Sequence, residues 1–117
     1  MCFPLDRIAI TLYDTTWNVI EMSDPTLLVL ASLAEGDKHG YAMMEDIERF
    51  AGVRLGPGTL YGAITRLEER GWIGPVKSRD DRRQPYRITA AGQEHLAEQL
   101  AGLNRVVKTG LSRLKQA

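Results

Sequence analysis

Lysine and arginine side chains, which can neutralise phosphates, concentrate in one part of the sequence. Residues 54–87 hold eight basic and four acidic residues, a net charge of +4, although the chain of 117 residues is neutral overall. Residues 1–53 hold three basic and nine acidic residues, and residues 88–117 carry a net charge of +2. A local basic surface on a neutral protein is typical of phosphate binding, although a solvated charged face would give the same count.

The densest basic segment is Ser78-Arg79-Asp80-Asp81-Arg82-Arg83-Gln84, which has the composition of a charged turn. Each phosphate that it neutralised would release counterions, so affinity would fall steeply with salt. A solvated turn with internal ion pairs is the alternative, since Asp80 and Asp81 could orient the arginines beside them. Arg87 alternates with Tyr86 and Ile88 and should face away from the core. Phosphate contacts are predicted for Lys77, Arg79, Arg82, Arg83 and Arg87.

Residue types that support catalysis are scarce. His39 and His95 are the only histidines, Cys2 is the only cysteine, and neither a phosphate-binding loop nor metal-ligand spacing is present. His39 is better explained as a turn residue and His95 as a residue of a helix surface. We therefore predict that the chain is not an enzyme and has no catalytic residue, cofactor or metal.

The cysteine count and hydropathy also limit the class of protein. One cysteine forms no intrachain disulfide, which excludes a cysteine-stapled scaffold and fits a reducing compartment. The longest apolar run, Leu27–Ala31, is far shorter than the ~20 residues of a membrane span or the ~7 of a signal-peptide core. We expect one cytoplasmic domain without membrane contact. A domain this small leaves an oligomer possible.

The elements that would position these residues begin at Asp24. Asp24 is a good N-cap and Pro25 suits the first helical position, so a helix is expected over 25–35, closed by Gly36. A turn follows over 37–40, and Gly52 ends a second helix over 41–51. One side of that second helix should be apolar, with Tyr41, Met44, Ile47 and Ala51.

A third helix, 57–70, has a narrow apolar stripe of Leu60, Ile64 and Leu67 at helical spacing. At ~100° per residue, Gly58 and Gly62 lie on the opposite side, where a bare backbone could approach DNA closely. Close packing of two helices is the alternative for Gly62, as half-buried packing is for Tyr61. Free N–H groups near the helix start favour phosphate. DNA contacts are predicted for Thr59, Tyr61, Gly62, Thr65 and Arg66.

Two short strands, 72–77 and 85–89, then flank the charged turn, and Thr89 caps a final helix over 90–115. Such a helix is about 39 Å long, too long to be covered by a three-helix core. We expect its apolar seam to pack on a second copy, although folding back on helix 25–35 is the alternative. The seam residues recur at a/d spacing and are Leu96, Leu100, Leu103, Val107 and Leu114.

This order of elements predicts a mainly α fold with a small β component: a winged helix-turn-helix with a two-stranded wing and a long C-terminal dimerisation helix. The recognition helix, 57–70, would enter the major groove, and the wing, 74–88, would reach the backbone or the minor groove. A twofold dimer would present two such helices to half-sites about one DNA turn apart or a multiple of it. A winged-helix module that binds proteins is the rival function.

Several motifs in this order resemble the PadR-like transcriptional regulators. They are His39-Gly40-Tyr41, Gly56-Pro57-Gly58-Thr59-Leu60-Tyr61, Arg66-Leu67-Glu68, Gly71-Trp72-Ile73 and Tyr86-Arg87-Ile88-Thr89-Ala90-Ala91-Gly92. The resemblance runs from about Pro25 to Leu114. It implies a homodimer that represses transcription from palindromic double-stranded operators, with a small apolar or phenolic effector relieving binding in many members.

Two departures from the family pattern limit what is carried over. Gly56 stands where the family often has serine or proline, and a single long helix leaves no room for a separate effector domain. Trp17 and Trp72 are the aromatic candidates for an effector pocket, and Trp72 is better explained as a core residue. The resemblance therefore supports DNA binding and dimerisation more than a ligand.

Three segments are expected along the chain: an N-terminal extension over 1–22, a winged helix-turn-helix domain over 23–89 and a dimerisation helix over 90–117. The extension lies outside the resemblance. Met22-Ser23-Asp24 reads like the beginning of a protein, so part of 1–21 is either a weakly ordered extension or an incorrectly assigned start. Intact-mass analysis of protein made from the native gene distinguishes the two, since a mass for all 117 residues excludes the wrong start.

Overall fold

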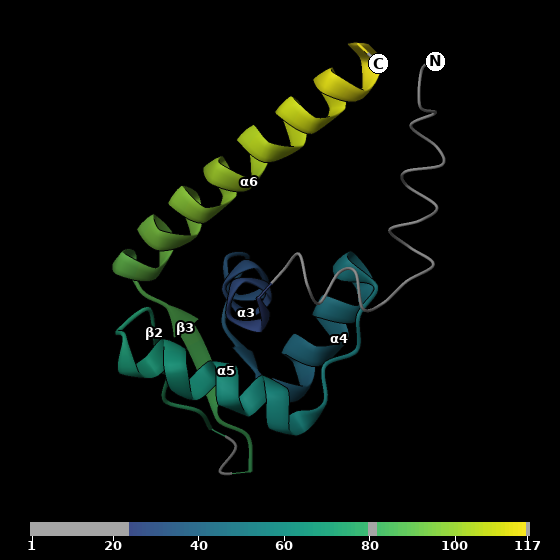
Figure 1. The fold of residues 1–117 in the computed structure, drawn as a ribbon. Coiled ribbons are helices and arrows are strands. Elements are labelled where there is room, and N and C mark those ends of the chain that lie inside the picture. Colours follow the sequence, from purple (N-terminus) through teal and green to yellow (C-terminus); the bar gives the residue numbers. More distant parts are fainter. Residues whose placement is uncertain (1–23, 80–81, 117) are drawn as a thin grey trace.

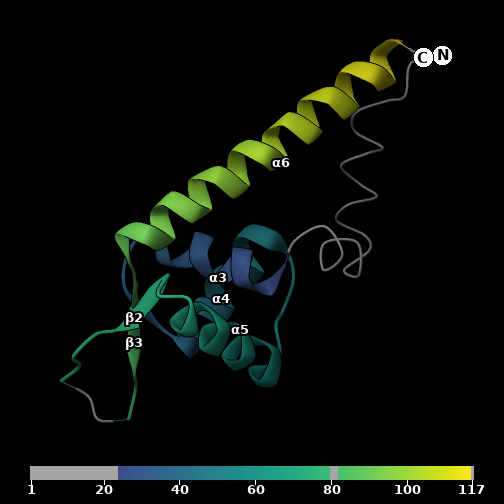
Figure 2. The ribbon, with the colours of Figure 1, turned by 60° about the vertical axis from the view of Figure 1, so that its left-hand side comes forward.

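The computed structural model describes residues 24–79 and 82–116. Four helices and a small antiparallel sheet at one edge of them form the fold, and the last helix projects away from the others (Figures 1 and 2). The predictions on residues 1–22, Trp17, Asp80 and Asp81 lie outside the described residues. The elements in chain order are α3 (Pro25–Leu33), β1 (Lys38–His39), α4 (Gly40–Ala51), α5 (Pro57–Glu69), β2 (Ile73–Pro75), β3 (Pro85–Ile88) and α6 (Ala90–Gln116).

Helix α3 begins as the sequence predicts and ends earlier. The Asp24 carboxylate accepts a hydrogen bond from the Thr26 backbone N–H at 2.8 Å, with Pro25 in the first turn. This bond is the main reason that the pKa of Asp24 lies below its usual value, with a smaller contribution from the charge of Arg66. The expected closure at Gly36 is wrong, because the helix ends at Leu33 and is capped by Ala34 in a right-handed conformation.

The sheet has a third strand that the sequence did not reveal. Residues 37–40 were expected to form a turn, but β1 pairs with β3, which lies between β1 and β2. A strand of two residues shows no alternating pattern, so only tertiary contacts define it. One such contact comes from Lys38, whose Nζ donates to the Ser32 carbonyl and lies 2.9 Å from Glu35.

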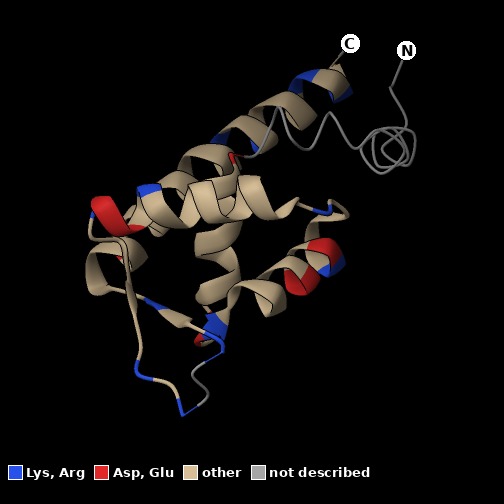
Figure 3. Ribbon diagram, turned by 90° about the horizontal axis from the view of Figure 1, so that it is seen from below, with Lys and Arg blue, Asp and Glu red and all other residues tan. Residues whose placement is uncertain are grey.

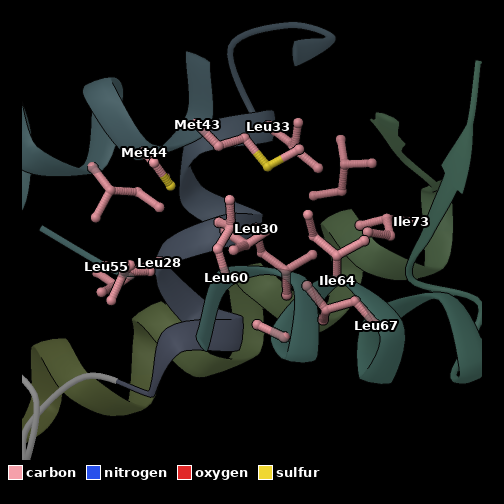
Figure 4. Close-up of a cluster of buried hydrophobic side chains, with 14 of the residues drawn as sticks. Leu28, Leu30, Leu33, Met43, Met44, Leu55, Leu60, Ile64, Leu67 and Ile73 are labelled. Carbon is pink, nitrogen blue, oxygen red and sulfur yellow. The ribbon is translucent and has the colours of Figure 1, made fainter. Parts of the chain in front are cut away.

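The hydrophobic core lies between α3, α4 and α5, and the first turns of α6 and the sheet close it (Figure 4). The predicted stripe of α5 is fully buried, with exposures of at most 2% for Leu60, Ile64 and Leu67. The prediction for α4 was partly wrong, because Met43 is buried while Tyr41 is 56% exposed. Glycine at position 52, with φ of 71°, ends α4 in the left-handed conformation as expected.

A tight turn joins α5 to the sheet. Gly71 adopts φ of 75°, its N–H donates to the Glu68 carbonyl, and the Trp72 N–H donates to the Leu67 carbonyl, both at 3.0 Å. This is the Schellman arrangement that glycine favours after a helix, and it confirms the predicted C-cap. The turn fixes the direction in which the chain leaves α5 and enters β2.

Helix α6 is fixed to the rest of the fold at its first turns. Thr89 caps it, since the Thr89 hydroxyl accepts from the Gly92 N–H at 3.0 Å and donates to the Gly71 carbonyl at 2.7 Å. A Cβ atom at Gly92 would lie 2.0 Å from the Trp72 carbonyl oxygen, so only glycine fits this crossing. The helices found in residues 24–79 and 82–116 include none with the length and apolar character that a bilayer crossing requires.

Candidate nucleic-acid interface

The outer face of α5 is open to solvent over most of its length. Thr59, Thr65 and Arg66 are exposed, as predicted. A Cβ atom at Gly58 would meet nothing within 4 Å, and one at Gly62 would meet only the end of the Arg66 side chain at 3.6 Å. Among residues 24–79 and 82–116, no other helix packs closely on Gly62, so that alternative is not supported there. Within the same residues, no neighbour accounts for two glycines on this face.

Tyr61 links α5 to the start of α4. The ring is 51% exposed, and its hydroxyl lies 2.6 Å from the point that a Cβ atom at Gly40 would occupy. Glycine is therefore required at position 40 for this side-chain position. Tyr61 therefore has a structural contact within the chain and also keeps an exposed phenol.

Of the other predicted contacts on α5, Thr65 has a hydrogen-bond partner in its own chain, and Arg66 borders a groove. The Thr65 hydroxyl donates to the Tyr61 carbonyl at 2.9 Å, which leaves its oxygen available only as an acceptor. Arg66 lies at the edge of the face and also lines a groove toward α6. Its guanidinium therefore lies between the open face and the groove.

The loop between β2 and β3 carries basic residues at the end of the molecule that α6 points away from (Figures 1 and 3). Lys77, Arg79, Arg82 and Arg83 are exposed there. Figure 3 shows basic positions along the loop, and acidic positions on helices away from the loop tip. The loop and α5 share this end of the molecule, so the fold brings the predicted phosphate-binding residues together.

Arg87 faces away from the core as predicted, but its guanidinium already has a partner. Its Nε and Nη2 donate to the two carboxylate oxygens of Asp37 at 3.1 and 2.8 Å. This hydrogen-bonded pair lowers the pKa of Asp37 and raises that of Arg87. The pair braces β3 against the segment before β1. A phosphate contact by Arg87 would have to use Nη1 or the second N–H of Nη2, or displace Asp37.

Helix α6 presents most of its predicted apolar seam to solvent. Leu100, Leu103, Val107 and Leu114 are between 37% and 51% exposed, and Val106, absent from the predicted seam, is 69% exposed. Leu96 differs because it is only 6% exposed and belongs to the core of its own chain. Leu96 lies in the second turn of α6, and its burial in its own core leaves little of this side chain to contact a second copy.

A groove of about 560 Å³ lies between α3, the end of α5 and α6. Trp72 was expected in the core. It is partly buried against the core and also lines this groove. Its ring stacks on His95 with centroids 3.6 Å apart, and the Arg70 guanidinium lies 5.1 Å from the ring centroid. His95 is thus a stacking residue and not a plain surface residue.

Three residues near this surface have roles that the sequence did not reveal. His39, expected to lie in a turn, caps α4 through Nδ1, which accepts from the Ala42 N–H at 3.3 Å. Asp37 holds Arg87, and Gly92 allows α6 to cross the backbone of Trp72. The family motifs include His39 and Gly92, so they mark both positions. The motifs do not indicate which residues these two contact.

Two helices joined by a short connection, α4 and α5, followed by a hairpin with a basic loop, define a winged helix-turn-helix. The sequence model of the transcriptional regulator PadR-like family matches residues 29–98. The chain belongs to this family of transcriptional regulators.

Individual relatives agree with this assignment. Over 84 residues the chain is 33% identical to the transcriptional regulator Rv3488 of Mycobacterium tuberculosis, covering 70% of this chain and 78% of that protein. It is 42% identical over 84 residues to an uncharacterized 37.1 kDa protein in transposon TN4556 of Streptomyces fradiae. That alignment covers 72% of this chain, but the chain spans only 24% of the length of the Streptomyces protein.

Solved structures share the fold. A transcriptional regulator from Clostridium thermocellum, Cth-833, superposes with a TM-score of 0.68 at 30% identity, covering 79% of this chain and 90% of that one. A PadR family transcription regulator from Clostridium difficile R20291 gives 0.67 at 22% identity, covering 78% and 97%. The second likeness supports the fold alone.

Proposed function

We propose that this chain is a homodimeric repressor that binds palindromic double-stranded DNA sequence-specifically. In this proposal α5 enters the major groove, with Thr59, Tyr61, Gly62, Thr65 and Arg66 toward the DNA. The loop between β2 and β3 reaches the backbone or the minor groove. Repression and palindromic operators come from the family resemblance.

The open glycine-containing face of α5 is the observation that carries this proposal. Gly58 and Gly62 have no neighbour among the described residues that demands glycine, so a surface that approaches from outside would explain their lack of side chains. The first turn of α5 adds uncapped backbone N–H groups, because Gly56 makes no side-chain cap. Exposed basic residues of the neighbouring loop supply the charge for the backbone.

Fluorescence anisotropy with the protein's own upstream region tests this function, with a scrambled duplex of equal length as the control. We expect nanomolar binding to the upstream duplex at moderate salt, at least 100-fold tighter than to the scrambled one, with two chains per site. Equal and weak binding to both duplexes would contradict the proposal and favour a winged helix that serves a protein partner.

Replacing Arg82 and Arg83 together by alanine should weaken binding and flatten its salt dependence. If each arginine neutralises one phosphate, the slope of log K against log salt should lose up to about two units. Titrations at several salt concentrations measure this slope. An Arg49→Ala variant on α4 is the control, because its exposed guanidinium is paired with Asp46 on the acidic side. An unchanged slope in the double variant would show that these two arginines do not contact DNA phosphates.

Gly40→Ala should separate the two roles of Tyr61. The new methyl group would collide with the Tyr61 hydroxyl, but a half-exposed side chain can rotate away, so the free energy of unfolding should change by less than about 1 kcal/mol. DNA affinity should fall about as much as in Tyr61→Phe, because both variants remove the hydroxyl from its position. Chemical denaturation and anisotropy measure the two effects. Wild-type affinity in both variants would contradict a DNA contact by Tyr61.

The groove beside α6 supports the proposal of a small aromatic effector. Trp72 and His95 offer a stacking surface, and Arg66 and Arg70 line the same groove and belong to α5 or its C-cap. A ligand there would contact the recognition helix and the dimerisation helix together. Quenching of tryptophan fluorescence by phenolic acids tests this, with Trp72→Phe as the control for the signal of Trp17.

A further inference from the structure

His39 lies where α4, β1 and the loop after β2 meet. Its backbone pairs with Pro85 of β3, and its Nδ1 accepts the Ala42 N–H as the cap of α4. On the other side of the ring, Nε2 lies 3.4 Å from Nη1 of Arg83. One imidazole therefore contacts a helix start with one nitrogen and a guanidinium with the other.

These two contacts make conflicting demands on a neutral imidazole, which has one N–H and one lone pair. When Nδ1 accepts from Ala42, the proton lies on Nε2. Nε2–H then faces an N–H of Arg83, which is a donor and never an acceptor. Two donors 3.4 Å apart cannot satisfy one another, but both can reach a single oxygen placed beside them.

We propose that His39 Nε2 and Arg83 Nη1 together bind one non-bridging phosphate oxygen of the DNA backbone. This inference rests on the proposed DNA binding and assigns a new contact residue to it. The oxygen would accept from both nitrogens and would relieve the donor conflict while His39 keeps its cap on α4.

The position of the pair suits a duplex that also contacts α5. Gly40, the residue after His39, lies against the Tyr61 hydroxyl of α5, and Arg83 belongs to the basic loop. A phosphate at this pair would therefore lie between the recognition helix and the wing. The Arg83 guanidinium carries a positive charge, so an anionic acceptor fits better than a neutral one.

The charged groups described around His39 are already engaged with one another. Asp37 is held by Arg87, and Lys38 is engaged by Glu35, Asp46 and the Ser32 carbonyl. Arg83 faces the ring from the loop, and Tyr61 approaches the next residue from α5. No carboxylate forms an ion pair with His39 among the residues that the structure describes.

His39→Ser tests the pair with the fold preserved. Serine is a good N-cap, so α4 keeps its start, but no donor remains at the position of Nε2. We expect about tenfold weaker binding of the upstream duplex, the effect of losing one hydrogen bond to a charged group. Thermal unfolding of the variant checks that its stability is unchanged.

The coupling between His39 and Arg83 distinguishes a shared phosphate contact from a structural role of His39 alone. Combining His39→Ser with Arg83→Ala should cost less than the product of the two single effects, because both donors share one oxygen.

A duplex with single methylphosphonate substitutions completes the test. At one position the methylphosphonate should weaken DNA binding by the wild type about tenfold and leave DNA binding by His39→Ser nearly unchanged. If the wild type binds the upstream duplex and His39→Ser matches its affinity, the pair is wrong and the proposed function stands. If the wild type shows no preference for the upstream duplex, both proposals fail.

Discussion

Gly92→Ala is expected to destabilise the protein by about 3 kcal/mol, toward the upper end of the cost of overpacking. The added Cβ atom would lie 2.0 Å from the Trp72 carbonyl oxygen and 2.9 Å from a side-chain carbon of Ile88. The carbonyl is backbone and already accepts the Thr89 N–H at 3.0 Å, so it cannot rotate away. The first turn of α6 must therefore lift off the sheet, and Leu96 with it.

Thermal unfolding measures this effect, with an expected decrease of roughly 10–20 °C in Tm for a domain of this size. Gly102→Ala in the same helix is the matched control, because its Cβ atom would meet only the end of Arg105 at 3.8 Å. Alanine there should be neutral or stabilise by up to about 1 kcal/mol through helix propensity. Equal stability of the two variants would show that the crossing at Gly92 can relax.

Replacing Leu100 and Val107 together by glutamate should abolish dimerisation and leave each chain folded. Both side chains are about half exposed in the single chain, so its core loses little. At a proposed dimer seam the four glutamates of two chains would be buried close together, at a cost of several kcal/mol. We expect more than a 100-fold increase in the dimer dissociation constant, and a parallel loss of affinity for a two-half-site operator.

Sedimentation equilibrium measures the association, and circular dichroism checks the fold. Ser112→Glu is the control, because at about 100° per residue Ser112 lies on the side of α6 opposite the seam. A double variant that remained dimeric would place the interface elsewhere on the chain. A monomeric variant with undiminished operator affinity would show instead that one chain is enough for recognition.

Most of the fold followed from local signals, because caps, prolines, glycines and apolar spacing act within a few residues. Asp24, Gly52, Gly71 and Thr89 each have the role expected of them. The signals failed where the partner is distant in sequence. Strand β1 exists only through its pairing with β3, and the burial of Leu96 depends on where α6 crosses the core.

The candidate nucleic-acid interface shows the same division between local signals, which the sequence reveals, and distant contacts, which it does not. Exposure of Thr59 and Arg66 follows from the position of the buried stripe on α5, which the sequence fixes by its period. The partners of Arg87 and His39 could not be predicted, since Asp37 and Arg83 lie 50 and 44 residues away. The residue types predicted that this surface is basic. Only the fold shows which of its charged side chains already form ion pairs or hydrogen bonds within the chain.

The narrow attachment of α6 makes it a lever arm. A helix of 27 residues extends about 40 Å, and Gly92 and Leu96 are its only buried residues, within two turns of its start. A rotation of about 5° at this joint would displace the far end by about 3 Å, close to the rise of one base pair. In a dimer joined through these arms, the stiffness of the Trp72–Gly92 joint would set how much variation in operator spacing the protein tolerates.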